Sequence, residues 1–424
     1  MRMTQLFTKT AKEPPHDAES ANAKLLVQGG FVHQEMAGVY SWLPLGLKTL
    51  RKVEAIIREE MDALGAQEIL MPGLQPKENW MTTGRWDTVD VLFKLKSQTK
   101  KEFALGATHE EIVTPLVKSF ISSYKDLPLA VYQIQTKYRD ELRAKSGVLR
   151  GREFGMKDLY SFHLSQEDLE DFYGRAMEAY MRVFGRCGIR AKVTEASGGD
   201  FSKKFSHEFH LETPAGEDNI LACTACSFAR NAEIATVKKG GSCPECGAAL
   251  GMTKGIEIGN IFDLGHKFAE AFNVEVTTED GEKQLVYMGC FGIGITRLVG
   301  AIVEASHDDR GIIWPKSVAP MAVHLVSLSS KDASLQARIR ETAEGLYDDL
   351  EKEGIEVLWD NRTDVSAGEK LVDADLLGFP LRLIISEKTL KDNAFEWKLR
   401  QEKTSSLVTV QDIRDEVIAF AAEE

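Results

Sequence analysis

The apolar positions of this chain follow clear periods, and each period predicts an element. A helical spacing over about residues 45–64 predicts a helix that stops at Gly65. Residues 130–137 and 152–163 alternate as strands do, so with the basic stretch 143–151 between them they predict a long hairpin. A helix capped by Ser165 should follow, and its apolar face is formed by Leu169, Phe172, Tyr173, Ala176, Tyr180, Val183 and Phe184.

The pattern changes near Trp314 and Pro315, where we predict a domain boundary. Beyond it, the apolar runs 323–327, 355–359 and 383–386 read as strands, and they alternate with helical patterns at 335–346 and 369–377. This alternation predicts a small α/β domain over 315–424, whereas 1–314 should form an α+β domain on an antiparallel sheet.

Two further strands are expected in the first domain. One, over 285–290, leads into a glycine-rich turn and then a helix over 295–304, and the other is a short strand at 67–71.

Composition narrows the class of protein. The 424 residues carry a formal net charge of −13 and are 43% hydrophobic, which is typical of a globular chain with full cores and excludes a disordered or collagen-like one. The negative total argues against coating nucleic acid without specificity, so DNA is not an expected partner. No stretch approaches 18 apolar residues without charge, and residues 1–19 do not resemble a signal peptide, so we expect a cytoplasmic protein with no membrane span.

The predicted hairpin is positively charged, although the chain as a whole is negative. Residues 137–157 hold seven basic and three acidic side chains, a local charge of +4. Arg139 on a strand is a rigid bidentate donor suited to a phosphate, Glu141 lies two residues on, and Phe154 on the return strand can stack a base. The alternative is a solvated basic hairpin.

Two further segments carry possible chemistry. In the stretch 289–297, glycines let a ligand approach the backbone and Arg297 in the first helical turn suits a terminal phosphate, although tight strand–helix packing explains the glycines equally well. Thr108 and Glu110 lie two residues apart and can hold an ammonium group if the segment is extended; the alternative is a helix N-cap at Thr108.

Four cysteines form two C-x-x-C pairs separated by sixteen residues, which fits the spacing of a closed structural zinc site. The pairs are Cys223 with Cys226, and Cys243 with Cys246, within a knuckle over about 221–250. Reduced free thiols or redox pairs are the alternatives.

Taken together, these segments resemble the class II aminoacyl-tRNA synthetases, and within them the bacterial prolyl-tRNA synthetases. The unit 38–72 resembles motif 1 of the class, 131–163 resembles motif 2 and 285–304 resembles motif 3. The family likeness extends along nearly the whole chain through further segments at 38–46, 84–86, 108–111, 151–158, 161–163 and 206–209, and through 367–378 in the second domain.

The resemblance implies ATP, proline and tRNA(Pro) as partners, Mg²⁺ as a cofactor, and a homodimer formed through motif 1. It implies that Arg139 and Arg297 are catalytic, holding the α- and γ-phosphates of ATP. Further ATP contacts are implied for Glu141, Arg150, Phe154 and Glu217, with Glu217 or Asp218 near Mg²⁺. Proline would contact Thr108, Glu110, Arg139 and His163.

For tRNA, the resemblance implies that Arg143 reaches the acceptor end. Anticodon contacts are implied for Arg362, Glu369, Lys370 and Asp373. Three positions depart from the family pattern: Ala107 replaces an expected proline, and Asn260 and Asp263 replace a histidine and a glutamine.

The interval 164–283 between motifs 2 and 3 holds 120 residues, too few for the core elements together with the editing domain that many bacterial relatives insert there. We therefore expect two-step attachment of proline to tRNA(Pro) without editing in cis. The alternatives are a non-catalytic RNA-binding or regulatory relative and a sister class II ligase for another amino acid. Retention of Arg139, Phe154 and Arg297 argues against the first.

Overall fold

The computed structural model describes residues 1–199 and 206–423. The chain divides into two compact units, which we describe separately. The large unit comprises residues 36–39 and 54–301, and the C-terminal unit comprises residues 1–35, 40–53 and 302–424.

A nine-stranded sheet forms the centre of the large unit, in the order β10-β9-β12-β11-β13-β16-β8-β7-β3. Its strands are β3 (Gln67–Glu68), β7 (Leu129–Tyr138), β8 (Glu153–His163), β9 (Lys192–Ala196), β10 (Ser206–Glu212), β11 (Asp218–Cys223), β12 (Ala229–Asn231), β13 (Leu250–Gly265) and β16 (Tyr287–Gly294). The pairs β7–β8, β8–β16 and β13–β16 are antiparallel, which confirms the predicted hairpin and the α+β class.

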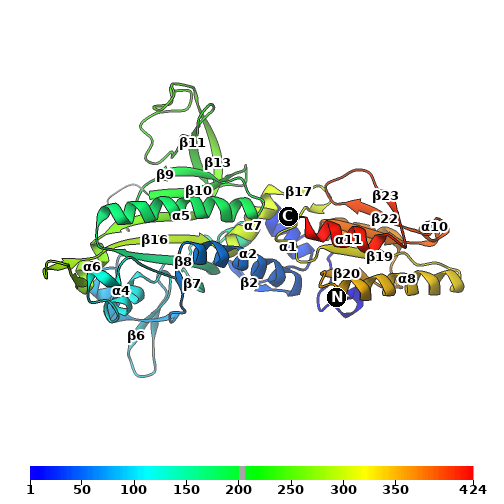
Figure 1. Ribbon diagram of the computed structural model, residues 1–424, viewed down its shortest axis with the longest axis horizontal. Coiled ribbons are helices and arrows are strands. Elements are labelled where there is room, and N and C mark those ends of the chain that lie inside the picture. Colours follow the sequence, from blue (N-terminus) through cyan, green and yellow to red (C-terminus); the bar gives the residue numbers. More distant parts are fainter. Residues whose placement is uncertain (200–205, 424) are drawn as a thin grey trace. The chain divides into compact units, whose positions relative to one another are not determined.

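Strand alternation divides the side chains of β7 and β8 between two faces of this sheet. On one face, Lys157 donates to the hydroxyl of Tyr180 in α5 (Gln166–Arg186), the helix that lies along the sheet in Figure 1. We call this the α5 face. On the other face, the hydroxyl of Tyr160 accepts from the backbone N–H of His109, at the start of α4 (Glu110–Lys118). We call this the α4 face.

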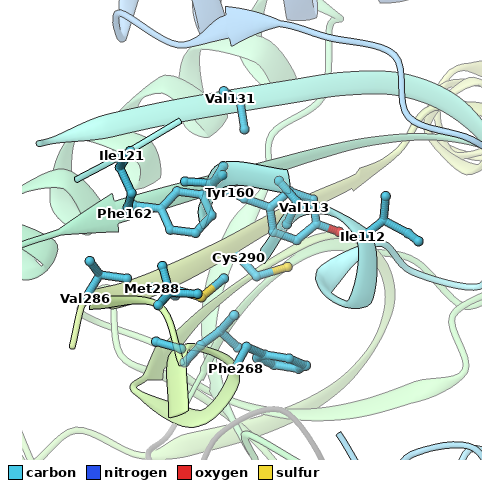
Figure 2. Packing of buried hydrophobic residues seen from close by; sticks show 14 of the residues in the cluster. Ile112, Val113, Ile121, Val131, Tyr160, Phe162, Phe268, Val286, Met288 and Cys290 are labelled. Atoms are coloured by element: carbon cyan, nitrogen blue, oxygen red, sulfur yellow. The ribbon is translucent and has the colours of Figure 1, made fainter. Parts of the chain in front are cut away.

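The helix α5 begins as its sequence predicts. The Ser165 hydroxyl accepts from the backbone N–H of Asp168, and the predicted apolar residues of the helix face the sheet. On the α4 face, Tyr160 and Phe162 pack with Cys290, Met288 and the apolar side of α4 in a continuous core, shown in Figure 2.

The C-terminal unit holds a five-stranded sheet in the order β20-β19-β21-β22-β23. The strands are β19 (Val323–Ser327), β20 (Val357–Asp360), β21 (Leu381–Ile385), β22 (Ala394–Leu399) and β23 (Ser406–Thr409). The first three are parallel, as the strand–helix alternation predicts, and β22 and β23 add an antiparallel edge. The helices of this part are α8 (Ala333–Lys352), α9 (Ala367–Leu377), α10 (Glu387–Lys391) and α11 (Ile413–Ala422).

The remaining elements are short or lie at the periphery of the two sheets. The helices are α1 (Ala21–Gln28), α2 (Pro44–Ala63), α3 (Lys77–Thr82), α6 (Lys267–Phe272) and α7 (Ile295–Ala305). The strands are β1 (Val32–Met36), β2 (Val39–Trp42), β4 (Leu74–Pro76), β5 (Lys94–Lys96), β6 (Glu102–Leu105), β14 (Glu275–Thr277), β15 (Lys283–Leu285), β17 (His307–Asp308) and β18 (Gly311–Ile312).

The N-terminal segment belongs to the C-terminal unit. The backbone oxygen of Met1 accepts from Trp359, and its terminal amine lies 2.8 Å from the carbonyl oxygen of Val357, so the first residues follow β20. The compact units therefore differ from a simple division at residue 314, because contacts distant in sequence join the first 35 residues to the last third of the chain.

Two local expectations were wrong. The glycine-rich stretch 289–294 is not a turn but the last six of the eight residues of β16, and α7 begins directly after it at Ile295. The strand expected at 67–71 covers only 67–68, although the backbone N–H of Ile69 still donates to the carbonyl of Tyr132 in β7. Among the described residues, no helix is long and apolar enough to cross a membrane.

Two glycines in different surroundings, Gly378 and Gly345, offer a matched test of this fold. Gly378 ends α9 with φ +69°, and a Cβ there would overlap the carbonyl oxygen of Ile312. We expect Gly378→Ala to lower the free energy of unfolding by at least about 2 kcal/mol, since strain and overlap add. Gly345 lies inside α8 with open space around it, so Gly345→Ala should raise that energy by about 0.5–1 kcal/mol.

Urea unfolding followed by circular dichroism measures both variants. Equal effects of the two substitutions would contradict the packing described at Gly378.

Candidate active site

Two adjoining cavities of about 90 and 230 Å³ open at the α4 face of the sheet, where β7, β8, β13 and β16 meet. Six residues line both of them: Arg139, Glu141, Leu149, Arg150, Glu257 and Arg297. Phe154, Gly292 and Gly294 line the smaller cavity, and Glu217 and Asp218 line the larger. The structure thus brings together every residue for which the sequence predicted contact with ATP.

Arg139 and Arg297 face the same cavities from different elements. Arg139 follows the end of β7, and Arg297 lies in the first turn of α7, immediately after β16. Burial, and then the charge of Arg297, lowers the pKa of Arg139. Two guanidinium groups that repel one another in a partly dry site favour a polyanion between them. The Arg139 guanidinium also lies 5.2 Å from the centre of the Phe154 ring.

Glu257 is a site residue that the sequence reading missed. Its carboxylate accepts from Arg297 at 3.1 Å and from the amide of Asn260 at 2.8 Å. A bulge in β13 opposite Phe209 and His210 places Glu257 on the same side as Asn260. No local pattern marks this bulge, so strand alternation read from the sequence would have sent Glu257 to the wrong face.

Arg150 connects two acidic residues of the larger cavity. Its guanidinium donates to Glu141 at 2.8 and 3.0 Å and to Glu217 at 3.0 Å. These contacts hold the end of the motif 2 loop over the cavity. Arg143 lies in the same loop with an exposed side chain, and Leu142 beside it is 96% exposed.

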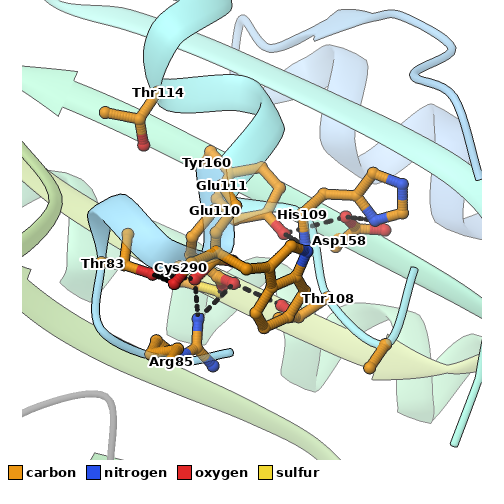
Figure 3. Close-up of polar contacts among 12 residues, drawn as sticks. Thr83, Arg85, Thr108, His109, Glu110, Glu111, Thr114, Asp158, Tyr160 and Cys290 are labelled. Carbon is orange, nitrogen blue, oxygen red and sulfur yellow. Dashed lines mark hydrogen bonds and ion pairs between the residues drawn. The ribbon is translucent and has the colours of Figure 1, made fainter. Parts of the chain in front are cut away.

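Thr108 and Glu110 also meet. The Thr108 hydroxyl donates to Glu110 at 2.5 Å, and the Cys290 thiol lies 3.1 Å from the other carboxylate oxygen, as Figure 3 shows. The N-cap of α4 is His109 rather than Thr108, so the alternative of an N-cap at Thr108 was wrong. Glu110 is the first residue of the helix rather than part of an extended segment, yet its side chain still meets that of Thr108. The carbonyl of Ala107 accepts from Arg139 at 3.4 Å, which joins this segment to the cavities.

The segment 107–110 rests on a buried polar network. His109 is fully buried, with one ring nitrogen 2.7 Å from the Lys137 amine and the other 3.2 Å from the carbonyl of Pro72. Burial, with the charge of Lys137, lowers the pKa of His109 to about 4, so the ring is neutral and accepts from Lys137. Lys137 in turn lies 2.7 Å from Asp158.

The structure does not bring His163 to this group. His163 differs by an odd number of positions from Asp158 and Tyr160, so strand alternation turns it to the α5 face. There its ring bonds Asp168 at 2.8 Å and packs on Phe172. The same alternation separates two of the positions that depart from the family pattern. Asn260 lines the cavity, whereas Asp263 bonds Gln166 of α5.

The residues expected to read an anticodon divide into two groups. Lys370 is 1% exposed and donates to the carbonyl of Ser327, and Asp373 accepts from Thr10 and Arg362. Helical spacing puts both on the inner face of α9, so the expectation that they read RNA is wrong; they stabilise the C-terminal unit. Glu369 is exposed, and Arg362 lines a cavity of about 220 Å³ with Arg2, Arg340 and Trp359.

The four knuckle cysteines converge as their spacing predicts. All four sulfur atoms lie within 4.8 Å of one another, with 3.4 Å between Cys223 and Cys246 and 3.7 Å between Cys226 and Cys243. A tetrahedral zinc with bonds of about 2.3 Å separates its sulfurs by about 3.8 Å. The Ala225 backbone N–H donates to Cys223 and lowers the pKa of that thiol, whereas hydrogen bonds among the neighbouring thiols raise the pKa of Cys226 and Cys246.

Two family descriptions match the chain. Residues 93–306 match the class II core domain of the tRNA synthetases for G, H, P, S and T, and residues 322–420 match an anticodon binding domain. In the solved structures, a similar fold is found in Giardia lamblia prolyl-tRNA synthetase in complex with prolyl-adenylate. The TM-score is 0.77 and the identity 18%, covering 94% of this chain and 78% of that one.

Curated relatives are similar along their full length. The proline–tRNA ligase of Moorella thermoacetica is 33% identical, covering 100% of this chain and 99% of the relative. That of Legionella pneumophila strain Paris is 32% identical with the same coverage. The alignment with the first spans 573 positions against the 424 residues here, so at least 149 positions have no counterpart in this chain.

The matched domains, the full-length relatives and the two arginines converging on one cavity lead to the same conclusion: this chain belongs to the prolyl-tRNA synthetase family of the class II aminoacyl-tRNA synthetases.

Proposed function

We propose that this protein activates proline with ATP and then transfers it to the 3′ end of tRNA(Pro). The observation that carries the proposal is the shared cavity that Arg139 and Arg297 line beside the ring of Phe154. Adenine stacks on Phe154 and is bonded by Glu141, the α-phosphate lies at Arg139, and the γ-phosphate lies at Arg297.

Proline occupies the adjoining site at Thr108 and Glu110. Its ring nitrogen is a secondary ammonium with two N–H donors, and the hydroxyl and carboxylate of these residues satisfy both. The carboxylate of proline then lies toward Arg139, which is connected to the same segment through Ala107. Attack of that carboxylate oxygen on the α-phosphorus forms prolyl-adenylate and releases pyrophosphate. No nucleophilic side chain is needed, because positioning and charge stabilisation supply the catalysis.

Magnesium fits the acidic wall of the cavities. Glu257, whose side chain is 26% exposed, and Glu217 present oxygen ligands beside the proposed phosphate positions. When bound, Mg²⁺ neutralises phosphate charge. Arg143 with its exposed loop would meet the acceptor end of tRNA, and Arg362 and Glu369 remain the proposed anticodon contacts. By likeness to motif 1, we propose a homodimer, and by likeness to soluble translation enzymes, a cytoplasmic location.

The exchange of pyrophosphate into ATP tests the first step. Among the twenty amino acids, we expect exchange with proline. Exchange with a different amino acid would identify a sister ligase. No exchange with any amino acid would identify a non-catalytic relative. Arg297→Ala should lower the proline-dependent rate at least about a hundredfold, because the leaving phosphates lose a fixed positive charge.

Arg297→Lys should recover only part of that rate, since an ammonium lacks the planar fork of a guanidinium. Arg175→Ala, at an exposed ion pair on α5, is the matched control and should exchange normally. An Arg297→Ala enzyme with unchanged exchange would remove the role proposed for this residue.

We further propose a structural zinc in the knuckle. Elemental analysis should find about one zinc per chain, and Cys226→Ser should lose it while proline-dependent exchange persists. Cys187→Ala, which changes a buried cysteine outside the cluster, should keep the metal. Metal-free protein with an intact knuckle would contradict the site.

The protein should also lack editing in cis. The described part of 164–283 forms α5, β9–β13, α6, β14 and the knuckle, and the alignment positions without counterpart amount to a domain of ordinary size. We expect pure protein to leave Ala-tRNA(Pro) intact under conditions where a relative with an editing domain hydrolyses it. Clear deacylation would disprove this.

A further inference from the structure

Next to the proposed proline site lies a second buried carboxylate that the reaction described above does not use. Glu110 and Glu111 are consecutive residues of the first turn of α4, and both are 0% exposed. A single guanidinium serves both, because Arg85 lies 2.8 Å from Glu111 and 3.6 Å from Glu110. Figure 3 shows Arg85 between the two carboxylates. We call these three residues the Arg85 triad.

The two carboxylates are bonded unequally. Glu110 accepts from the Thr108 hydroxyl on one oxygen and lies within reach of the Cys290 thiol on the other, so donors serve both of its oxygens. Glu111 accepts from the Thr83 hydroxyl and from Arg85, both through Oε1. Its Oε2 is buried and has no hydrogen-bond partner. Burial of the unbonded Oε2 therefore favours the neutral form of Glu111, although the bonds from Thr83 and Arg85 oppose it.

Among the residues that the structure describes, no second ammonium or guanidinium group lies within ion-pair distance of Glu110 or Glu111. From β7 and β8, Lys137 and Asp158 neutralise each other at 2.7 Å. Tyr160 and Cys290 are neutral, since burial raises the pKa of both, and His109 is neutral as well. Arg139 lines the two cavities, and its charge also interacts with that of Glu110. From α3 and α6, the rings of Trp80 and Phe268 lie over Arg85 at 5.3 and 5.4 Å. With both carboxylates ionised, the empty triad has a net charge of −1.

We propose that Glu111 is a positioning residue that holds a proton while the amino-acid site is empty and releases it when the ammonium group of the substrate binds Glu110. The proton leaves the Glu111 carboxyl for solvent, and no other bond changes. The ammonium charge then balances the second carboxylate. This inference rests on the proposed function of the Thr108–Glu110 pair, and it adds a residue and a regulation by pH that this function does not require.

The pKa of Glu111 is raised, as a carboxyl that holds a proton in the empty site requires. Burial raises it to about 7, the neighbouring Glu110 acts in the same direction, and Arg85 opposes both. A bound cation lowers the pKa of a nearby carboxyl, so the bound state retains fewer protons than the empty state. The affinity for proline is therefore highest well above pH 7, where Glu111 is ionised in the empty site. It falls as the pH drops through the pKa of the empty site.

Titration calorimetry with L-proline tests the proposal. We expect wild-type affinity to be about tenfold weaker at pH 6 than at pH 8, the fraction that a pKa of about 7 predicts. At pH 7, titrations in two buffers with different ionisation enthalpies should show release of about half a proton per proline bound. A residue with only a structural role would show no such release.

Glu111→Gln fixes the neutral form while preserving shape. Its affinity should be the same at pH 6 and pH 8, more than about tenfold weaker than that of the wild type at pH 8, and accompanied by no proton release. Glu167→Gln, at an exposed position of α5, is the matched control and should keep the wild-type pH dependence. Lys157 also has a pKa near 7, but it lies beneath Tyr180 on the α5 face and is unchanged in both variants.

The outcomes separate the two proposals. Wild-type affinity that varies less than twofold from pH 6 to 8, or a Glu111→Gln variant that keeps the wild-type slope, overturns the role of Glu111 while leaving proline activation intact. Protein that neither binds proline nor exchanges pyrophosphate with it overturns both. If Glu111→Gln fails to fold, proton release by the wild type still decides the matter.

Discussion

The alternation of side chains across β7, β8 and β16 is the constraint on which the rest of this protein depends. Successive residues of a strand point to opposite faces, so one hairpin supplies both a core and a site. Arg139, Phe154, Asp158 and Tyr160 belong to the α4 face, whereas Lys157 and His163 belong to the α5 face. A slip of one residue in this register would exchange the two sets and destroy both functions.

The α4 face tolerates an unusual density of buried charge because each charge has a specified partner. Lys137 is paired with Asp158 and bonded to His109, and that network holds the segment from which Thr108 and Glu110 project. Burying such groups is costly when they are unpaired, so the network makes one arrangement of the site much more favourable than its alternatives. In the Arg85 triad one guanidinium serves two carboxylates, so with both ionised the triad has a net charge of −1, which the ammonium group of an amino acid would offset.

Several features were predictable from the sequence because they depend on neighbours along the chain. The hairpin, the cap of α5 by Ser165, the strand–helix alternation of the second domain and the convergence of the four cysteines all follow from local period or spacing, and the structure confirms them. The predictions about Lys370 and Asp373 failed because a motif identifies a residue but not the face of α9 on which it lies.

The sequence by itself determined the family, the order of the main elements and six of the residues that line the two cavities, namely Arg139, Glu141, Arg150, Phe154, Glu217 and Arg297. Only the tertiary structure decided that Glu257 joins Arg297, that His163 faces away from the site, and that Arg85 serves two carboxylates. The first of these depends on a bulge in β13, the second on strand register and the third on contacts across 25 and 26 positions of the chain. Local patterns report the period of a segment, whereas these contacts depend on how separate segments pack, and that is decided by the fold as a whole.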